Sequence, residues 1–201
     1  MYAIVTNNEI TKFINHPKSM VIGDVQYPAK IFQLWSTSEL NAIGIYEVVF
    51  DDSNKKDEQW YINTNQSFSF SDNTVTASYG SATAKAHADT LWTAQDETDG
   101  KGTEGEVATR GLKYNLIQTL KSQVANELAN TDWYITRNTE KSTAIPSAIS
   151  THRDAVRTKQ AQMETAITNA SDTPALETLY TYTTTDGVQS RPLGELPILE
   201  S

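Results

Sequence analysis

Residues 112–170 read LKYNLIQTLKSQVANELANTDWYITRNTEKSTAIPSAISTHRDAVRTKQAQMETAITNA. In the first part of this stretch, apolar side chains recur about every fourth position, with polar residues between them. The apolar positions are Leu112, Leu116, Ile117, Leu120, Val124 and Leu128. Because an α-helix has 3.6 residues per turn, this spacing gathers them on one face. The pattern predicts an amphipathic helix that buries this face.

A second helix is predicted from Ile145–Pro146 to Ala170, because proline suits the first position of a helix, where its missing N–H is no loss. Its apolar positions are more widely spaced. They are Ile149, Val156, Met163 and Ile167. The stripe is narrow, since His152 and Lys159 stand where a coiled coil has apolar residues. We therefore predict an α-helical hairpin with a tight corner at residues 131–137.

The candidate partner-binding residues lie at this corner and on the second helix. Trp133 and Arg137 are four residues apart and would share a helical face, where a cation–π contact contributes about 0.5–2 kcal/mol. We favour Trp133 as a buried plug for the hairpin, since large aromatics mostly bury area, over a ligand contact. Arg153 and Arg157, beside Lys159, form a basic side that we read as solvated. The alternative is a docking face for an acidic partner.

Composition limits the classes of function. The 201 residues include 16 Lys and Arg and 25 Asp and Glu, a net charge of −9. This charge argues against binding to nucleic acid, which requires a basic surface, and against binding to an anionic membrane. The charge is uneven, since residues 1–110 hold 8 basic and 15 acidic residues and residues 111–201 hold 8 and 10. The two halves could therefore attract different partners.

Cysteine is absent, so disulfides and thiolate chemistry are excluded. No apolar run approaches the length of a membrane span. The chain does not begin with a basic segment and a long apolar core, so we expect no secretory signal and synthesis in a cytoplasm.

The N-terminal part of the chain predicts β-structure. Short apolar runs flank residues 6–9, where two asparagines suit a tight hairpin turn. Ser36 followed by Glu39 is a capping-box pattern, and Gly44 suits the end of the short helix that it begins. Further apolar runs as far as Tyr79 are typical of strands.

The predicted fold class is α+β, with a small β-rich N-terminal domain, one short helix within it, and a C-terminal α-helical hairpin. The β-rich domain is assigned to residues 1–92. Residues 93–109 are charged, glycine-containing and poor in apolar residues, which is typical of a flexible linker. The helical domain is assigned to residues 110–180, and residues 181–201 to a C-terminal tail.

Two ligand motifs in residues 93–109 are rejected. Gly100, Gly102 and Gly105 match the glycine pattern of a dinucleotide site, but acidic residues rather than a strand precede them. A calcium loop would have Glu106 as its bidentate ligand and Gln95 as its first ligand, where an aspartate is expected. We predict no metal and no cofactor.

No catalytic constellation is recognisable. The three histidines His16, His87 and His152 are far apart, without metal-ligand spacing. Asp51–Asp52 and Asp57–Glu58 flank Lys55–Lys56 in a polar loop, which favours a solvated turn over acid–base chemistry. We predict that the protein is not an enzyme.

The corner and the second helix resemble a segment common in tail-fibre and tail-fibre assembly proteins of tailed bacteriophages. The matching residues are Thr131, Asp132, Trp133, Tyr134, Arg137, Glu140, Ile145, Pro146, Arg153, Ala155, Val156 and Arg157. The stretches YPAKIFQLWS at 27–36, AIGIY at 42–46 and YINTN at 61–65 resemble tail-associated proteins of marine phages. The resemblance covers most of residues 1–180.

This resemblance implies a small β-rich domain joined to a helical segment, with no known catalytic residues. The chain is shorter than a whole receptor-binding fibre, which favours an accessory or connecting protein. We therefore expect a non-enzymatic protein that assists fibre assembly or joins fibre to baseplate. Its expected partners are fibre or baseplate proteins, or further copies of itself. It would lie in the host cytoplasm during assembly and then in the virion tail.

The alternative function is a module of the phage tail that binds or processes host glycans. Trp35, Trp60 and Trp92 could stack on sugar rings. Paired catalytic carboxylates, which most glycosidases require, do not stand out.

Overall fold

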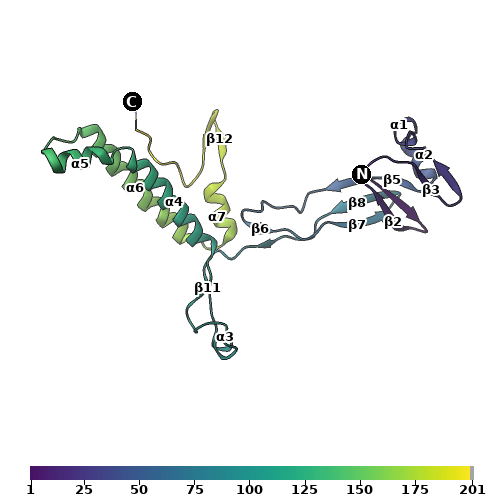
Figure 1. The fold of residues 1–201 in the computed structure, drawn as a ribbon, viewed down its shortest axis with the longest axis horizontal. Coiled ribbons are helices and arrows are strands. Elements are labelled where there is room, and N and C mark those ends of the chain that lie inside the picture. The colour runs from purple at the N-terminus through teal and green to yellow at the C-terminus, as the bar shows by residue number, and fades with distance from the viewer. Residues whose placement is uncertain (200–201) are drawn as a thin grey trace. The chain divides into compact units, whose positions relative to one another are not determined.

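The computed structural model describes residues 1–199 and is mixed α+β, as predicted (Figure 1). The chain divides into two compact units, Met1–Thr83 and a second that begins at Ala84. The boundary therefore falls between Thr83 and Ala84, and not at the predicted linker.

The first unit is built on a five-stranded sheet. In order across the sheet, its strands are β2 (Glu9–Ile14), β1 (Tyr2–Thr6), β5 (Ile45–Asp51), β8 (Thr74–Ser78) and β7 (Ser67–Ser71). Strands β5 and β8 are parallel, and the other neighbours are antiparallel. Two short pairs accompany the sheet. They are β3 (Met20–Ile22) with β4 (Val25–Tyr27), and β6 (Tyr61–Ile62) with β9 (Thr83–Ala84).

The sheet packs on both faces. Ala3, Val48 and Val75 form one buried cluster, and Ile31, Leu40 and Ile45 form the other. The sheet curls, so that its edge strands β2 and β7 approach each other, with the rings of Phe13 and Phe68 4.5 Å apart between centroids. Curling lets this short sheet enclose a core and partly shields its two open edges.

The local signals of the first unit act as predicted. Asn7 and Asn8 have positive φ angles and join β1 to β2 in a tight hairpin. Ser36 and Glu39 form the complete capping box that begins α2 (Thr37–Ala42). Gly44 follows the end of α2 with a φ of 81°. A single turn, α1 (Ile31–Leu34), precedes α2, so the prediction of one short helix was incomplete.

The prediction of a flexible linker at residues 93–109 is wrong, because this stretch is folded within the second unit. Strand β10 (Thr90–Leu91) pairs with β11 (Val107–Thr109), and α3 (Ala94–Thr98) lies between them. Thr93 caps α3, and its hydrogen bonds hold the pKa of Asp96 at about 2. The stretch is stabilised mainly by such polar contacts, which explains why its composition predicted a linker.

Four further helices belong to the second unit. They are α4 (Leu112–Ala129), α5 (Asp132–Lys141), α6 (Ser147–Asn169) and α7 (Thr173–Tyr180). Helices α4 and α6 lie side by side and antiparallel, and Lys113 near the start of α4 donates to the carbonyl of Thr168 near the end of α6 at 2.8 Å (Figure 1). The predicted corner is itself a helix, α5. None of the helices in residues 1–199 is both long and apolar enough to cross a membrane.

The predicted stripes of α4 and α6 supply buried residues between these helices. The fully buried members are Leu120, Val124, Ile149, Val156, Met163 and Ile167. Residues beyond 180, predicted as a tail, include a hairpin of β12 (Thr183–Thr185) and β13 (Val188–Ser190). Leu193 is buried and donates its backbone N–H to the carbonyl of Leu179.

Gly44 provides a test of the first unit. A Cβ at this position would lie 2.8 Å from the carbonyl oxygen of Val5, and the φ of 81° disfavours any other residue. We expect Gly44→Ala to lower the free energy of unfolding by about 2 kcal/mol or more. Gly23→Ala is the matched control, because Gly23 also has a positive φ but open space around it, and it should cost about 1 kcal/mol. Urea unfolding of both variants measures the difference, and equal losses would contradict the crowding argument.

Candidate functional site

The turn between α4 and α5 is tight and is made by two residues. Asn130 keeps helical dihedral angles, and the chain changes direction at Thr131, whose φ is −116° and ψ is 2°. The hydroxyl of Thr131 makes no capping hydrogen bond to α5. It donates instead to the carbonyl of Leu128 at 3.0 Å. Thr131 is buried, so its remaining lone pairs require a donor from elsewhere in the unit.

Arg153 of α6 is that donor. Its Nη1 lies 2.6 Å from the Thr131 hydroxyl and 2.8 Å from the carbonyl oxygen of Leu128. The same nitrogen forms an ion pair with Asp132, the first residue of α5, at 2.9 Å. One guanidinium thus joins the end of α4, the turn and the start of α5 to α6.

The prediction that Arg153 belongs to a solvated face is therefore wrong. Its exposed fraction is 7%, and its charge is used inside the unit. Arg153 follows Ile149 by four residues and precedes Val156 by three, so the helical period itself places it on the buried face. The apolar pattern did not include Arg153, because arginine is charged. His152 is buried beside it, with Nε2 3.0 Å from a carboxylate oxygen of Glu127 on α4.

Trp133 does not close the hairpin, so the prediction that it is buried is also wrong. Half of its surface, 51%, is exposed. Arg137 lies over it, with the guanidinium carbon 4.7 Å from the indole centroid, as the spacing predicted. Tyr134, which was not among the predicted partner-binding residues, completes the group, its ring 3.8 Å from that of Trp133 between centroids. We call Trp133, Tyr134 and Arg137 the α5 cluster.

The four candidate residues therefore separate into three environments. Trp133 and Arg137 share the α5 cluster, in which Trp133 is exposed and Arg137 half-buried, and Arg153 is internal. Arg157, one turn further along α6, is exposed and forms an ion pair with Asp154 at 3.6 Å. An exposed pair at this distance contributes little to stability or recognition. The α5 cluster is thus the part of the predicted site that offers an accessible, chemically distinctive surface.

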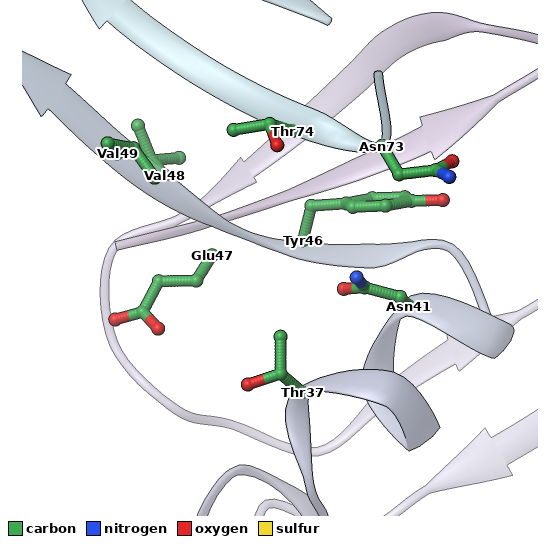
Figure 2. A pocket seen from close by; sticks show the side chains of 8 residues that line it. All are labelled: Thr37, Asn41, Tyr46, Glu47, Val48, Val49, Asn73 and Thr74. Carbon is green, nitrogen blue, oxygen red and sulfur yellow. The ribbon is translucent and has the colours of Figure 1, made fainter. Parts of the chain in front are cut away.

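The first unit holds a pocket of about 380 Å³ (Figure 2). Figure 2 shows Thr37 and Asn41 entering from α2, Tyr46 and Glu47 from β5, and Asn73 from the turn between β7 and β8. Val48, Val49 and Thr74 complete its lining. Of the described residues that line it, Glu47 alone is a carboxylate, whereas glycoside hydrolysis requires two in most enzymes. The lining can hold a small polar ligand by hydrogen bonds, and it offers no acid–base pair.

The tryptophans proposed to stack on sugars are engaged elsewhere. Trp60 is buried, which removes it from any sugar-binding surface. Trp35 is half-buried and meets Tyr27 edge to face at 5.8 Å. The indole of Trp92 lies against Gly102, where a Cβ would come within 2.2 Å of Nε1. These three residues give the glycan alternative little support.

In the glycine-containing stretch 93–109, a lysine pairs with two neighbouring aspartates. Lys101 forms ion pairs with Asp96 and Asp99, each at 3.1 Å. Gly102 serves the close packing of Trp92 rather than the approach of a phosphate. Within residues 1–199, no group of three or more His, Asp or Glu side chains is placed to hold a metal ion.

Comparison of the chain with protein-family models, curated proteins and solved structures finds no match.

The structure predicts that Arg153 contributes more to stability than Trp133, the reverse of the expectation from the sequence. Arg153→Ala should lower the free energy of unfolding of the second unit by about 2–4 kcal/mol, because buried acceptors lose their donor. Trp133→Ala should cost under about 1 kcal/mol, since the side chain is half exposed. Arg157→Ala, the control for loss of an exposed arginine, should cost under about 0.5 kcal/mol. Thermal unfolding followed by circular dichroism ranks the three, and a larger loss for Trp133→Ala would return it to the role of a plug.

Proposed function

We propose that this chain is a non-enzymatic bacteriophage tail-fibre-associated protein that assists fibre assembly or joins the fibre to the baseplate. The observation that carries the proposal is the α5 cluster, which lies within the segment that resembles tail proteins. An aromatic pair with a stacked arginine is the composition enriched at the centres of protein–protein interfaces.

The proposed role uses two binding parts. We propose a small β-rich N-terminal domain and a C-terminal helical hairpin domain that fold independently. Each unit has buried clusters of its own, which supports this division. A connecting or assembly protein requires two binding parts, since it holds one tail component while presenting another.

The α5 cluster is presented by a rigid support. Arg153 fixes α5 against α4 and α6 through three contacts of 2.9 Å or less. Binding then orders few additional groups, and the entropic cost of association falls. Arg153 thus positions α5, and the α5 cluster contacts the partner.

A non-enzymatic role is supported by the chemistry of the pocket in Figure 2, whose lining has one carboxylate. The alternative proposal is a glycan-binding module of the same tail. It would use the polar lining of this pocket rather than the three tryptophans.

The proposed setting is the host cytoplasm during assembly, followed by the tail of the virion. Mass spectrometry of purified virions tests the second part. If the protein is absent from virions whose fibre attachment requires it, it is an assembly factor, and the connecting role loses its support.

Binding by the α5 cluster is tested with purified fibre and baseplate proteins of the same phage. Trp133→Ala should weaken binding at least about 30-fold, the loss typical of a central interface tryptophan, while the thermal melt stays close to that of the parent. Tyr114→Ala is the matched control, because Tyr114 is also an exposed aromatic residue stacked on an arginine in this unit, Arg110, at 4.2 Å. It should bind as the parent does.

Two results would overturn the proposal. One is that neither fibre nor baseplate proteins bind the full chain. The other is that the chain binds or cleaves host glycans while Trp133→Ala behaves as the parent, which favours the alternative.

A further inference from the structure

The arginines of this chain differ in whether they pair with a carboxylate. Four of the five form an ion pair with a carboxylate. The pairs are Arg110 with Asp89, Arg153 with Asp132, Arg157 with Asp154, and Arg191 with Glu195. Arg137 is the exception, with no ion pair anywhere in the described residues 1–199. In a chain with a net charge of −9, carboxylates are plentiful, so this exception is informative.

Neighbouring carboxylates do not serve Arg137. Asp132 begins the same helix but is used by Arg153 at 2.9 Å. Glu140, three residues after Arg137, is exposed and forms no ion pair with it. In addition, the Nε of Arg137 is a buried donor without an acceptor. The charge is therefore uncompensated within the described part of the chain.

The aromatic rings hold the guanidinium in place. Its carbon lies 4.7 Å from the centroid of Trp133 and 5.4 Å from that of Tyr134. Stacking restricts an otherwise flexible side chain and reduces its contact with water. A restricted, partly desolvated guanidinium loses less entropy and less hydration when it binds a planar anion, and its N–H groups match a carboxylate in a two-point contact.

We propose that the α5 cluster binds a carboxylate side chain of an acidic segment in the protein partner, with Arg137 contacting the carboxylate and Trp133 covering it. This proposal rests on the proposed function for the identity of the partner. Charge complementarity selects the occupant, since Arg137 is the one arginine without a carboxylate partner among the described residues 1–199. A polyanionic membrane or nucleic acid is disfavoured, because a chain of net charge −9 repels such a surface as a whole. A single acidic segment meets only the local charge of the cluster.

The first test uses the fibre or baseplate protein that binds the full chain. Arg137→Lys keeps the charge but loses the planar contact, and we expect binding about 10-fold weaker. Arg137→Glu should weaken it more than 100-fold, and the parent's affinity should fall as salt is raised. Arg110→Lys is the matched control, because Arg110 also stacks on an exposed aromatic ring but already pairs with Asp89 at 2.6 Å. It should bind as the parent does, and thermal melts confirm that each variant is folded.

The second test needs no partner. The Nε–H resonance of Arg137 and the indole N–H resonance of Trp133 are followed by NMR in the full chain. The probes are a short blocked peptide of two glutamates and the same peptide with two glutamines. We expect both resonances to shift with the glutamate peptide at millimolar concentration, and not with the glutamine peptide.

The outcomes separate the two proposals. Shifts with the glutamate peptide, without binding to any tail protein, support carboxylate recognition and overturn the proposed function. Partner binding that is unchanged in both Arg137 variants, without peptide shifts, overturns carboxylate recognition and leaves the proposed function. A glucuronate sugar that shifts the resonances more strongly than the glutamate peptide would replace the protein partner with an acidic glycan. Self-association that Arg137→Glu abolishes would replace it with a second copy.

Discussion

The guanidinium of Arg153 joins three helices at one point. It donates to the hydroxyl of Thr131 and to the carbonyl of Leu128, and it pairs with Asp132. A tight turn leaves carbonyl groups at the end of one helix without partners and buries a hydroxyl between helices. An internal cation satisfies these groups together, at the cost of its own desolvation. The orientation of α5, and therefore of everything it presents, depends on this contact.

The surface beyond this contact differs from the rest of the unit. Asp132 pairs with Arg153 and lies five residues before Arg137, outside the positions three and four residues away that a helix places side by side. Those positions before Arg137 hold Tyr134 and Trp133, whose rings stack on its guanidinium. Within residues 1–199, the half-buried Arg137 therefore has aromatic neighbours and no carboxylate partner. If the α5 cluster binds partners as proposed, the geometry of the turn determines its specificity.

The first unit obeys different constraints. Its sheet has few residues, and it buries apolar side chains by curling and by packing on both faces. Its turns and its capping box depend on short-range contacts, which fix the ends of the strands and of α2. Strands β1 and β8 lie on opposite edges of β5: Ile45–Glu47 pair with β1 along one edge, and Val48–Asp51 pair with β8 along the other. The pocket in Figure 2 lies where the pairing with β8 begins, beside Val48 and Thr74.

The sequence by itself determined what depends on neighbours along the chain. Periodicity located α4 and α6 and their buried faces, and asparagines at 7 and 8 marked a hairpin turn. The spacing of Trp133 and Arg137 predicted their stacking. Only the tertiary structure decided which of Trp133 and Arg153 is buried. Burial of a charge depends on acceptors from other parts of the chain, here the hydroxyl of Thr131 in the turn between α4 and α5, 22 residues before Arg153. Hydrophobicity alone would bury Trp133 and expose Arg153. It accounts for the cost of burying a charge but not for the acceptors that offset this cost.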